Sequence, residues 1–197
     1  MTDTVKQKNE MFEQFIDKIE VVYAVLLAWG FARVAERFVY SWSYVCGALI
    51  SGLVLIRFFF AASHNVKPIA EKSEISPLHQ KFLFFWDIPL LILHSFIYYR
   101  MCVALSEFNF MHFYIIFCNL LGINVIWLIS INDRLIRKGA RPLQWCSKWT
   151  LNNFVHISIF AVLIISRRDY LLFWVALSNC VIDFSLTASD YLGFKSK

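Results

Sequence analysis

The sequence predicts an all-α integral membrane protein with six transmembrane helices. Six continuous apolar runs fill most of the chain, each close to the roughly 20 residues of helix that cross a hydrocarbon core about 30 Å thick. Hydrophobic residues make up 59% of the 197 and charged residues only 17%, which is too few polar groups to cover a soluble domain. Because the runs are continuous and do not alternate, they favour helices over the strands of a barrel.

Short polar linkers separate the six predicted spans. Glu20 and Arg33 weaken the first span and the fifth is short, so a four-span arrangement with these two at the membrane surface is an alternative. We expect residues 1–15 to form a cytoplasmic N-terminal segment and residues 16–194 to form a single transmembrane domain. In chain order the predicted spans cover residues 16–38, 40–63, 82–104, 108–131, 150–167 and 170–190.

Lysine and arginine are distributed unequally between the two sides of this predicted bundle. Thirteen fall on the side that holds both termini and five on the other, with Arg57 inside a span and not counted. The positive-inside rule places the richer side, and therefore both termini, in the cytoplasm of a bacterial inner membrane. The net charge of +5 is then mainly a topology signal, and we expect no nucleic-acid partner.

The linker predicted at residues 132–149 carries a basic cluster of four side chains: Arg134, Arg137, Lys138 and Arg141. The simplest interpretation is attraction to anionic lipid, worth about 1 kcal/mol per basic residue near the surface. The alternative is a docking site for a cytoplasmic protein or an anionic messenger.

Aromatic residues gather near the predicted span ends. Amphipathic rings favour the headgroup layer, so we interpret them mainly as membrane anchors. These residues are Tyr40, Trp42, Tyr44, Tyr98, Tyr99, Trp145, Trp149, Tyr170 and Trp174.

Polar side chains inside the apolar runs are candidate sites, since an ionisable group at the bilayer centre costs about 2.5–3.5 kcal/mol. Asp87 and His94 are seven positions apart in the third span and therefore share a helix face. Pro89 follows Asp87 and either kinks that helix or lies in its first turn.

A polar stripe runs along the last span. Asn179, Asp183 and Asp190 lie at intervals of four and seven, which places them on one face. The structural interpretation is hydrogen bonding between helices, with Asp183 or Asp87 paired to Arg57 or His94. The functional interpretation is an ion or proton route.

Recognisable catalytic motifs are missing from the sequence. It holds no lipase-type nucleophile motif, no zinc-protease histidine motif and no glycine-rich phosphate loop. The five cysteines are scattered without a C-x-x-C pair, and inside apolar runs such residues act as small hydrophobes. We therefore expect neither an enzyme nor a metal site, and no cofactor.

The first span is the candidate pore helix. Glu20 opens it, and Val22, Val25, Trp29 and Ala32 follow i, i+3, i+7, i+10 spacing, so the four share one face. An apolar face that lines a symmetry axis can form a hydrophobic gate, which closes by dewetting. The alternative is that this face packs against lipid or a neighbouring helix.

Two short stretches support a family resemblance. The first stretch opens the first span: the family has Phe-Ser-Asp followed by Gly-Val-Phe-Ala-Ile, and this chain has Lys18-Ile19-Glu20 followed by Val21-Val22-Tyr23-Ala24-Val25. The second stretch ends the second span: the family often has Asn-His there, and this chain has His64-Asn65. With its six-span layout, the chain resembles the transmembrane-protein-175 family of cation channels. The resemblance implies four subunits around a pore lined by the first helix. Lys18-Ile19 and Trp29 depart from the family pattern, so the resemblance does not extend to potassium selectivity.

We therefore expect an oligomeric ion channel or pore whose hydrophobic gate lies on the first helix. Its expected partners are the lipid bilayer, further copies of the chain and monovalent cations. A second hypothesis is a membrane effector or accessory protein of a bacterial defence system, gated by a cytoplasmic protein or an anionic messenger. A third is a proton-coupled or lipid-handling transporter that uses Asp87, His94 and Asp183.

Overall fold

The computed structural model describes residues 21–65, 83–137 and 144–191. These residues are helical apart from short connections, and no strand occurs among them, which confirms the predicted all-α class. The first helix covers residues 21–36 of the described part. The remaining elements are α2 (Trp42–Asn65), the π-helical turn η1 (Leu83–Asp87), α5 (Ile88–Ser106), α6 (Phe110–Arg137), α7 (Gln144–Ile165), the 3-10 turn η2 (Asp169–Leu171) and α8 (Leu172–Tyr191).

Four stretches of the described helices are long and apolar enough to cross a membrane, which supports an integral membrane protein. The apolar stretch of α2 is shorter and covers Trp42–Phe58. The predicted fifth span, which the sequence left short, is among the four because its helix begins at Gln144, well before residue 150. The four stretches are Phe85–Ser106, Phe110–Ser130, Ser147–Ile165 and Asp169–Leu186.

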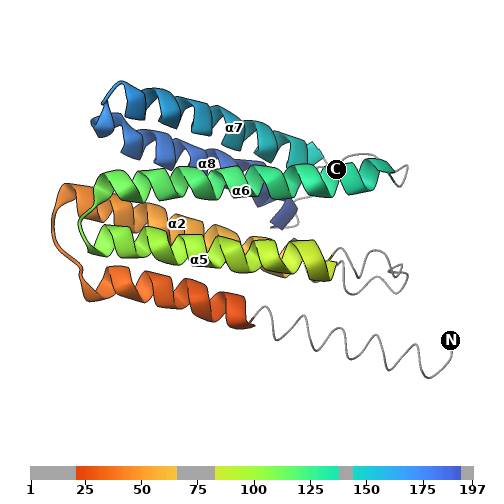
Figure 1. Cartoon of the computed structure of the whole chain (residues 1–197), viewed down its shortest axis with the longest axis horizontal. Helices are drawn as coiled ribbons and strands as arrows, with labels where there is room; N and C mark the ends of the chain where they lie inside the picture. Colours follow the sequence, from red (N-terminus) through yellow and green to blue (C-terminus); the bar gives the residue numbers. More distant parts are fainter. Residues whose placement is uncertain (1–20, 66–82, 138–143, 192–197) are drawn as a thin grey trace.

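The helices lie side by side and alternate in direction (Figure 1). The three described connections, 37–41, 107–109 and 166–168, lie at one end of the bundle, on the left of Figure 1. Helices α5, α6, α7, α8 and α2 form a closed ring of neighbours in that order, and α2 also touches α6. The apolar core draws residues from all five helices of the ring and, through Tyr23, Leu27 and Val34, from the first helix.

The first helix lies outside the ring, against α5 and α2. A Cβ atom on Gly30 would lie 3.2 Å from the Tyr98 ring and 3.2 Å from the Cα atom of Tyr99, so the glycine lets the first helix approach α5 closely. The hydroxyl of Tyr44 on α2 donates a hydrogen bond to the Val34 carbonyl at 2.7 Å. These contacts fix which face of the first helix is turned inward.

Three of the predicted aromatic anchors are interior residues. Tyr44, Tyr98 and Trp149 are buried, and the Tyr98 hydroxyl donates to the Ser51 carbonyl at 3.0 Å. The anchor interpretation is wrong for these three because a ring near a span end can turn toward the bundle as readily as toward the headgroups. Tyr40, Trp42, Tyr170 and Trp174 are exposed, as expected of anchors.

The polar linker predicted at residues 132–149 is mostly helix. Helix α6 continues to Arg137 and α7 begins at Gln144. The prediction was wrong because hydropathy detects only the part of a helix that lies within the hydrocarbon. Backbone hydrogen bonding continues into the polar turns beyond it.

Two helices end in the left-handed backbone conformation without a glycine. Phe108 after α5 has φ of 58° and Arg167 after α7 has φ of 55°. After α7, the N–H groups of Arg168 and Arg167 donate to the carbonyls of Leu163 and Ile164, the paired bonds of a Schellman motif. These caps satisfy the last carbonyls of each helix where the chain reverses direction.

Candidate functional site

A buried ion pair joins α2 to α8. Arg57 Nη1 pairs with Asp183 Oδ2, and the two side chains are only 7% and 0% exposed. Asp183 stands eight residues before the end of α8 at Tyr191, about 12 Å along the helix axis, so the pair lies well inside the bundle. Burying two charges at this depth is expensive unless each meets the other and further polar groups.

Helix α7 supplies those further groups. The Asn152 amide donates a hydrogen bond to Asp183 Oδ1 at 2.7 Å. The Arg57 guanidinium carbon lies 5.1 Å from the centroid of the buried Trp149 ring, within cation–π range. Trp149 and Asn152 are three positions apart, so one face of α7 presents both to the ion pair.

The same face of α7 continues with amide and imidazole contacts to α8. The Asn179 amide donates to Asn153 Oδ1 at 3.2 Å. His156 Nδ1 lies 2.8 Å from the Asn152 carbonyl, which can only accept, so this nitrogen carries a hydrogen. His156 Nε2 lies 2.9 Å from the Ser178 hydroxyl oxygen.

We call this group the polar network: Arg57, Trp149, Asn152, Asn153, His156, Ser178, Asn179 and Asp183. It links three helices of the ring and keeps its two formal charges next to each other. Some of its hydrogen-bonding capacity is unused: Arg57 Nη2, Asn153 Nδ2 and Asn179 Oδ1 are buried without a hydrogen-bond partner among the described residues. Such atoms are uncommon in folded proteins and mark the most polar part of this interior.

A second polar group lies between η1, α5 and α6. Trp127 Nε1 donates a hydrogen bond to Asp87 Oδ1 at 3.0 Å. His94 Nδ1 lies 2.7 Å from the Leu90 carbonyl of its own helix, and its ring packs edge-on against Trp127 and Phe58. Among the pairings that the sequence allowed, the ion pair that the described residues form is Arg57 with Asp183.

The sequence placed several of these residues correctly on inward faces. Asn179 and Asp183 are both buried, as the predicted stripe on the last span requires. Asp87 and His94 are also buried, and Pro89 lies in the first turn of α5.

The α7 members of the polar network were not recognised from the sequence. Trp149, Asn152, Asn153 and His156 occupy i, i+3, i+4 and i+7, a polar face that the sequence does contain. Asn152, Asn153 and His156 fall inside the predicted span 150–167, and their helical spacing is the signal that could have found them. Trp149 lies just outside that span, where a ring also suits the headgroup layer.

The predicted gate face of the first helix points away from the bundle. Val22 is 50% exposed, Val25 60% and Trp29 51%, and Ala32 is exposed as well. Tyr23, Leu27 and Val34 on the opposite face are buried. The Tyr99 ring of α5 packs against one side of Trp29, with ring centroids 4.9 Å apart.

Several predicted site residues fall outside what the structure describes. Glu20, Lys138 and Arg141 lie in segments that are not described, and for Arg134 and Arg137 only the helical backbone of α6 is. For Asp190, likewise, only the helical backbone is described.

No protein-family model, no curated protein and no solved structure matches this chain. The resemblance to the transmembrane-protein-175 family therefore stays a prediction.

Proposed function

We propose that the chain forms a homo-oligomeric pore in a membrane, with the exposed face of the first helix lining the shared axis. The observation that supports this most directly is the orientation of that helix. Its predicted gate residues Val22, Val25 and Trp29 are turned outward, while Tyr23 and Leu27 are buried against the rest of the bundle. A face that is held outward by packing behind it is available to other copies of the chain.

The polar network also supports a pore between chains, because it is better explained as a structural link than as part of an ion path. Its two charges face each other and are held by Asn152 and Trp149, which is the arrangement of a structural link between helices. An ion path along the inside of a single chain would also have to open the packed apolar interior of the bundle. A path between chains leaves it intact, and an apolar constriction such as a ring of Trp29 side chains would gate it by dewetting.

The proposal includes a topology. We place six spans in the bilayer, counting the first helix and α2, with both termini on the cytoplasmic side of a bacterial inner membrane. The basis is the excess of lysine and arginine on that side. Four copies around the axis follow the family resemblance, and monovalent cations are the proposed permeating ions.

Ion flux into liposomes tests this function. The purified full-length chain in liposomes should pass monovalent cations, and Trp29→Ala should increase the flux by removing bulk from the constriction. Phe154→Ala is the matched control, because Phe154 on α7 is also exposed and aromatic but lies on a different helix of the bundle. The proposal fails if the wild-type chain passes no cations, or if Phe154→Ala changes the flux as much as Trp29→Ala.

A second candidate function is a membrane effector or accessory protein of a defence system, gated by a cytoplasmic protein or an anionic messenger. It is favoured by the length of α6, whose candidate span ends at Ser130 while the helix continues to Arg137. These seven residues add about 10 Å of helix, which carries Arg134 and Arg137 beyond the apolar stretch. Expression alone and beside its genomic neighbours, with membrane potential recorded, tests this idea; an intact potential in both cases contradicts it.

A further inference from the structure

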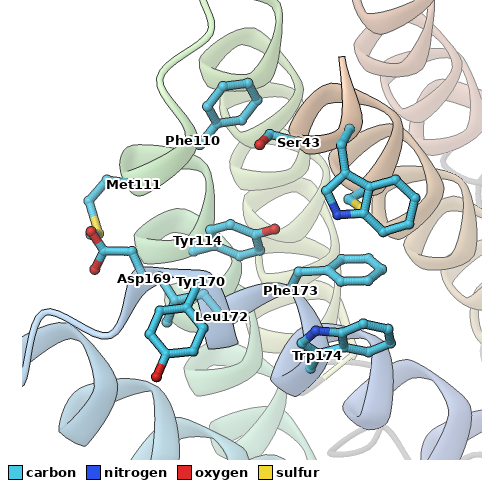
Figure 2. A pocket seen from close by; sticks show the side chains of 11 residues that line it. Ser43, Phe110, Met111, Tyr114, Asp169, Tyr170, Leu172, Phe173 and Trp174 are labelled. Atoms are coloured by element: carbon cyan, nitrogen blue, oxygen red, sulfur yellow. The ribbon is translucent and has the colours of Figure 1, made fainter. Parts of the chain in front are cut away.

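A hollow of about 380 Å³ opens at the end of the bundle where α2, α6 and α8 begin. Figure 2 shows its lining: Tyr114 of α6 in the middle, Phe173 and Trp174 of α8 on one side, and Asp169 and Tyr170 on the other. Trp42 of α2 also lines it. We call it the aromatic hollow. Its size is within the range of small-molecule pockets, roughly 300–1,000 Å³.

The walls of the aromatic hollow are rings from three helices. Trp42 packs edge-on against Phe173 with centroids 6.2 Å apart, and Phe173 against Trp174 at 5.0 Å. Trp42, Tyr170 and Trp174 are 72%, 73% and 57% exposed, so much of their surface remains available for a ligand. Aromatic faces carry negative charge and attract cations, especially alkylammonium groups.

Asp169 adds a formal negative charge on the side of the hollow that lies across Tyr114 from Phe173 and Trp174 (Figure 2). Its side chain is exposed and lines the hollow, and it has no ion pair with any residue that the structure describes. A carboxylate just before α8 also suits the positive end of the helix dipole. The dipole accounts for an acid at this position, but it does not account for the aromatic walls around the hollow.

We propose that the aromatic hollow binds the ammonium head group of a zwitterionic phospholipid. The ammonium contacts the aromatic faces and the Asp169 carboxylate, which are the two groups that recognise such a cation. The hollow lies where the candidate spans Phe110–Ser130 and Asp169–Leu186 begin, at the depth where head groups meet a membrane protein. A lipid is therefore the source of the ammonium, and the proposal does not depend on whether the chain conducts ions.

Native mass spectrometry of the purified full-length chain tests the proposal. The probes are two phospholipids with identical short acyl chains, a phosphatidylcholine and a phosphatidylglycerol, which differ in the presence of an ammonium. We expect the wild-type chain to bind the phosphatidylcholine more tightly. Asp169→Asn should weaken that binding roughly twofold to fivefold, as expected for the loss of one exposed charge contact while the aromatic rings stay in place.

Glu107→Gln is the matched control. Glu107 is an exposed acid at the same end of the bundle, in the connection between α5 and α6, and it does not line the hollow. Its replacement should leave the preference for phosphatidylcholine unchanged. The proposal is overturned if both lipids bind equally, if Asp169→Asn keeps the wild-type preference, or if Glu107→Gln lowers it as much. Displacement of the lipid by free choline at equal concentration would overturn the lipid as the source.

Discussion

Arg57 on α2 and Asp183 on α8, far apart in the sequence, form an ion pair that is almost completely buried. Asn152 and Trp149 of α7 also contact the two charges: Asn152 donates a hydrogen bond to Asp183, and the Trp149 ring lies against Arg57. The ion pair thus joins α2 to α8, and its contacts with Asn152 and Trp149 join α7 to both, so the stability of the bundle should depend on it.

Removing one member of the ion pair should lower the unfolding free energy strongly. Arg57→Met or Asp183→Leu alone leaves an uncompensated buried charge, for which we expect a loss of about 3–5 kcal/mol of unfolding free energy. The double variant Arg57→Met/Asp183→Leu should recover most of this loss, because an apolar pair of similar volume has no charge to desolvate. Unfolding of the four proteins in detergent measures the coupling; a double variant as unstable as the sum of the two single variants would contradict the assignment.

Asn152 should contribute less to the free energy of unfolding than the ion pair does, but more than a surface hydrogen bond. Asn152→Ala removes the 2.7 Å bond to Asp183 Oδ1, and we expect a loss of about 1–3 kcal/mol because the acceptor is charged. Ser158→Ala on the same helix is the control, since the exposed Ser158 hydroxyl donates to the Phe154 carbonyl of its own helix and to no other helix among the described residues. Equal losses of unfolding free energy in the two variants would show that the Asn152 hydrogen bond to Asp183 contributes no more than an exposed hydrogen bond within one helix.

Gly30 should tolerate no larger side chain. A Cβ atom there would lie 3.2 Å from Tyr98 and from the Tyr99 backbone, so Gly30→Leu should lower the unfolding free energy by about 1–3 kcal/mol through overpacking. No atom of the described residues outside the backbone of its own helix lies within 4 Å of a Cβ on Gly122 of α6, so Gly122→Ala should instead stabilise the chain by roughly 0.5–1 kcal/mol. Thermal unfolding of both variants in one detergent makes the comparison. Opposite signs are expected, and a destabilising Gly122→Ala or a neutral Gly30→Leu would count against this packing.

Arg167 should be replaceable by glycine with a gain in stability. Its φ of 55° is strained for a residue with a Cβ atom, so Arg167→Gly should raise the unfolding free energy by about 1 kcal/mol. Arg167→Ala loses the same charge but keeps the strain, so it should show no such gain. Melting temperatures of the two variants separate backbone strain from charge, and equal melting temperatures would remove strain as the cause.

The residues of α8 and α7 illustrate why some site members were predictable and others were not. Asn179 and Asp183 stand out in an apolar run, and helical periodicity alone places them on one face. Trp149 lies near a span end, where periodicity and hydropathy do not distinguish an interior ring from an anchor. Its burial depends on α7 beginning at Gln144 and on Arg57 approaching from α2, and both are consequences of packing between distant segments.

The helical membrane class and the inward faces of the last and third spans follow from local properties of the chain. Apolar composition, run length and helical period act over one segment at a time, and the bilayer sets the length that matters. The choice of Asp183 over Asp87 as the partner of Arg57 depended on which helices became neighbours. The continuation of α6 to Arg137 and the shared hollow of α2, α6 and α8 depended on the fold as well. Such contacts join residues far apart in the sequence, and hydropathy within a single segment carries no information about them.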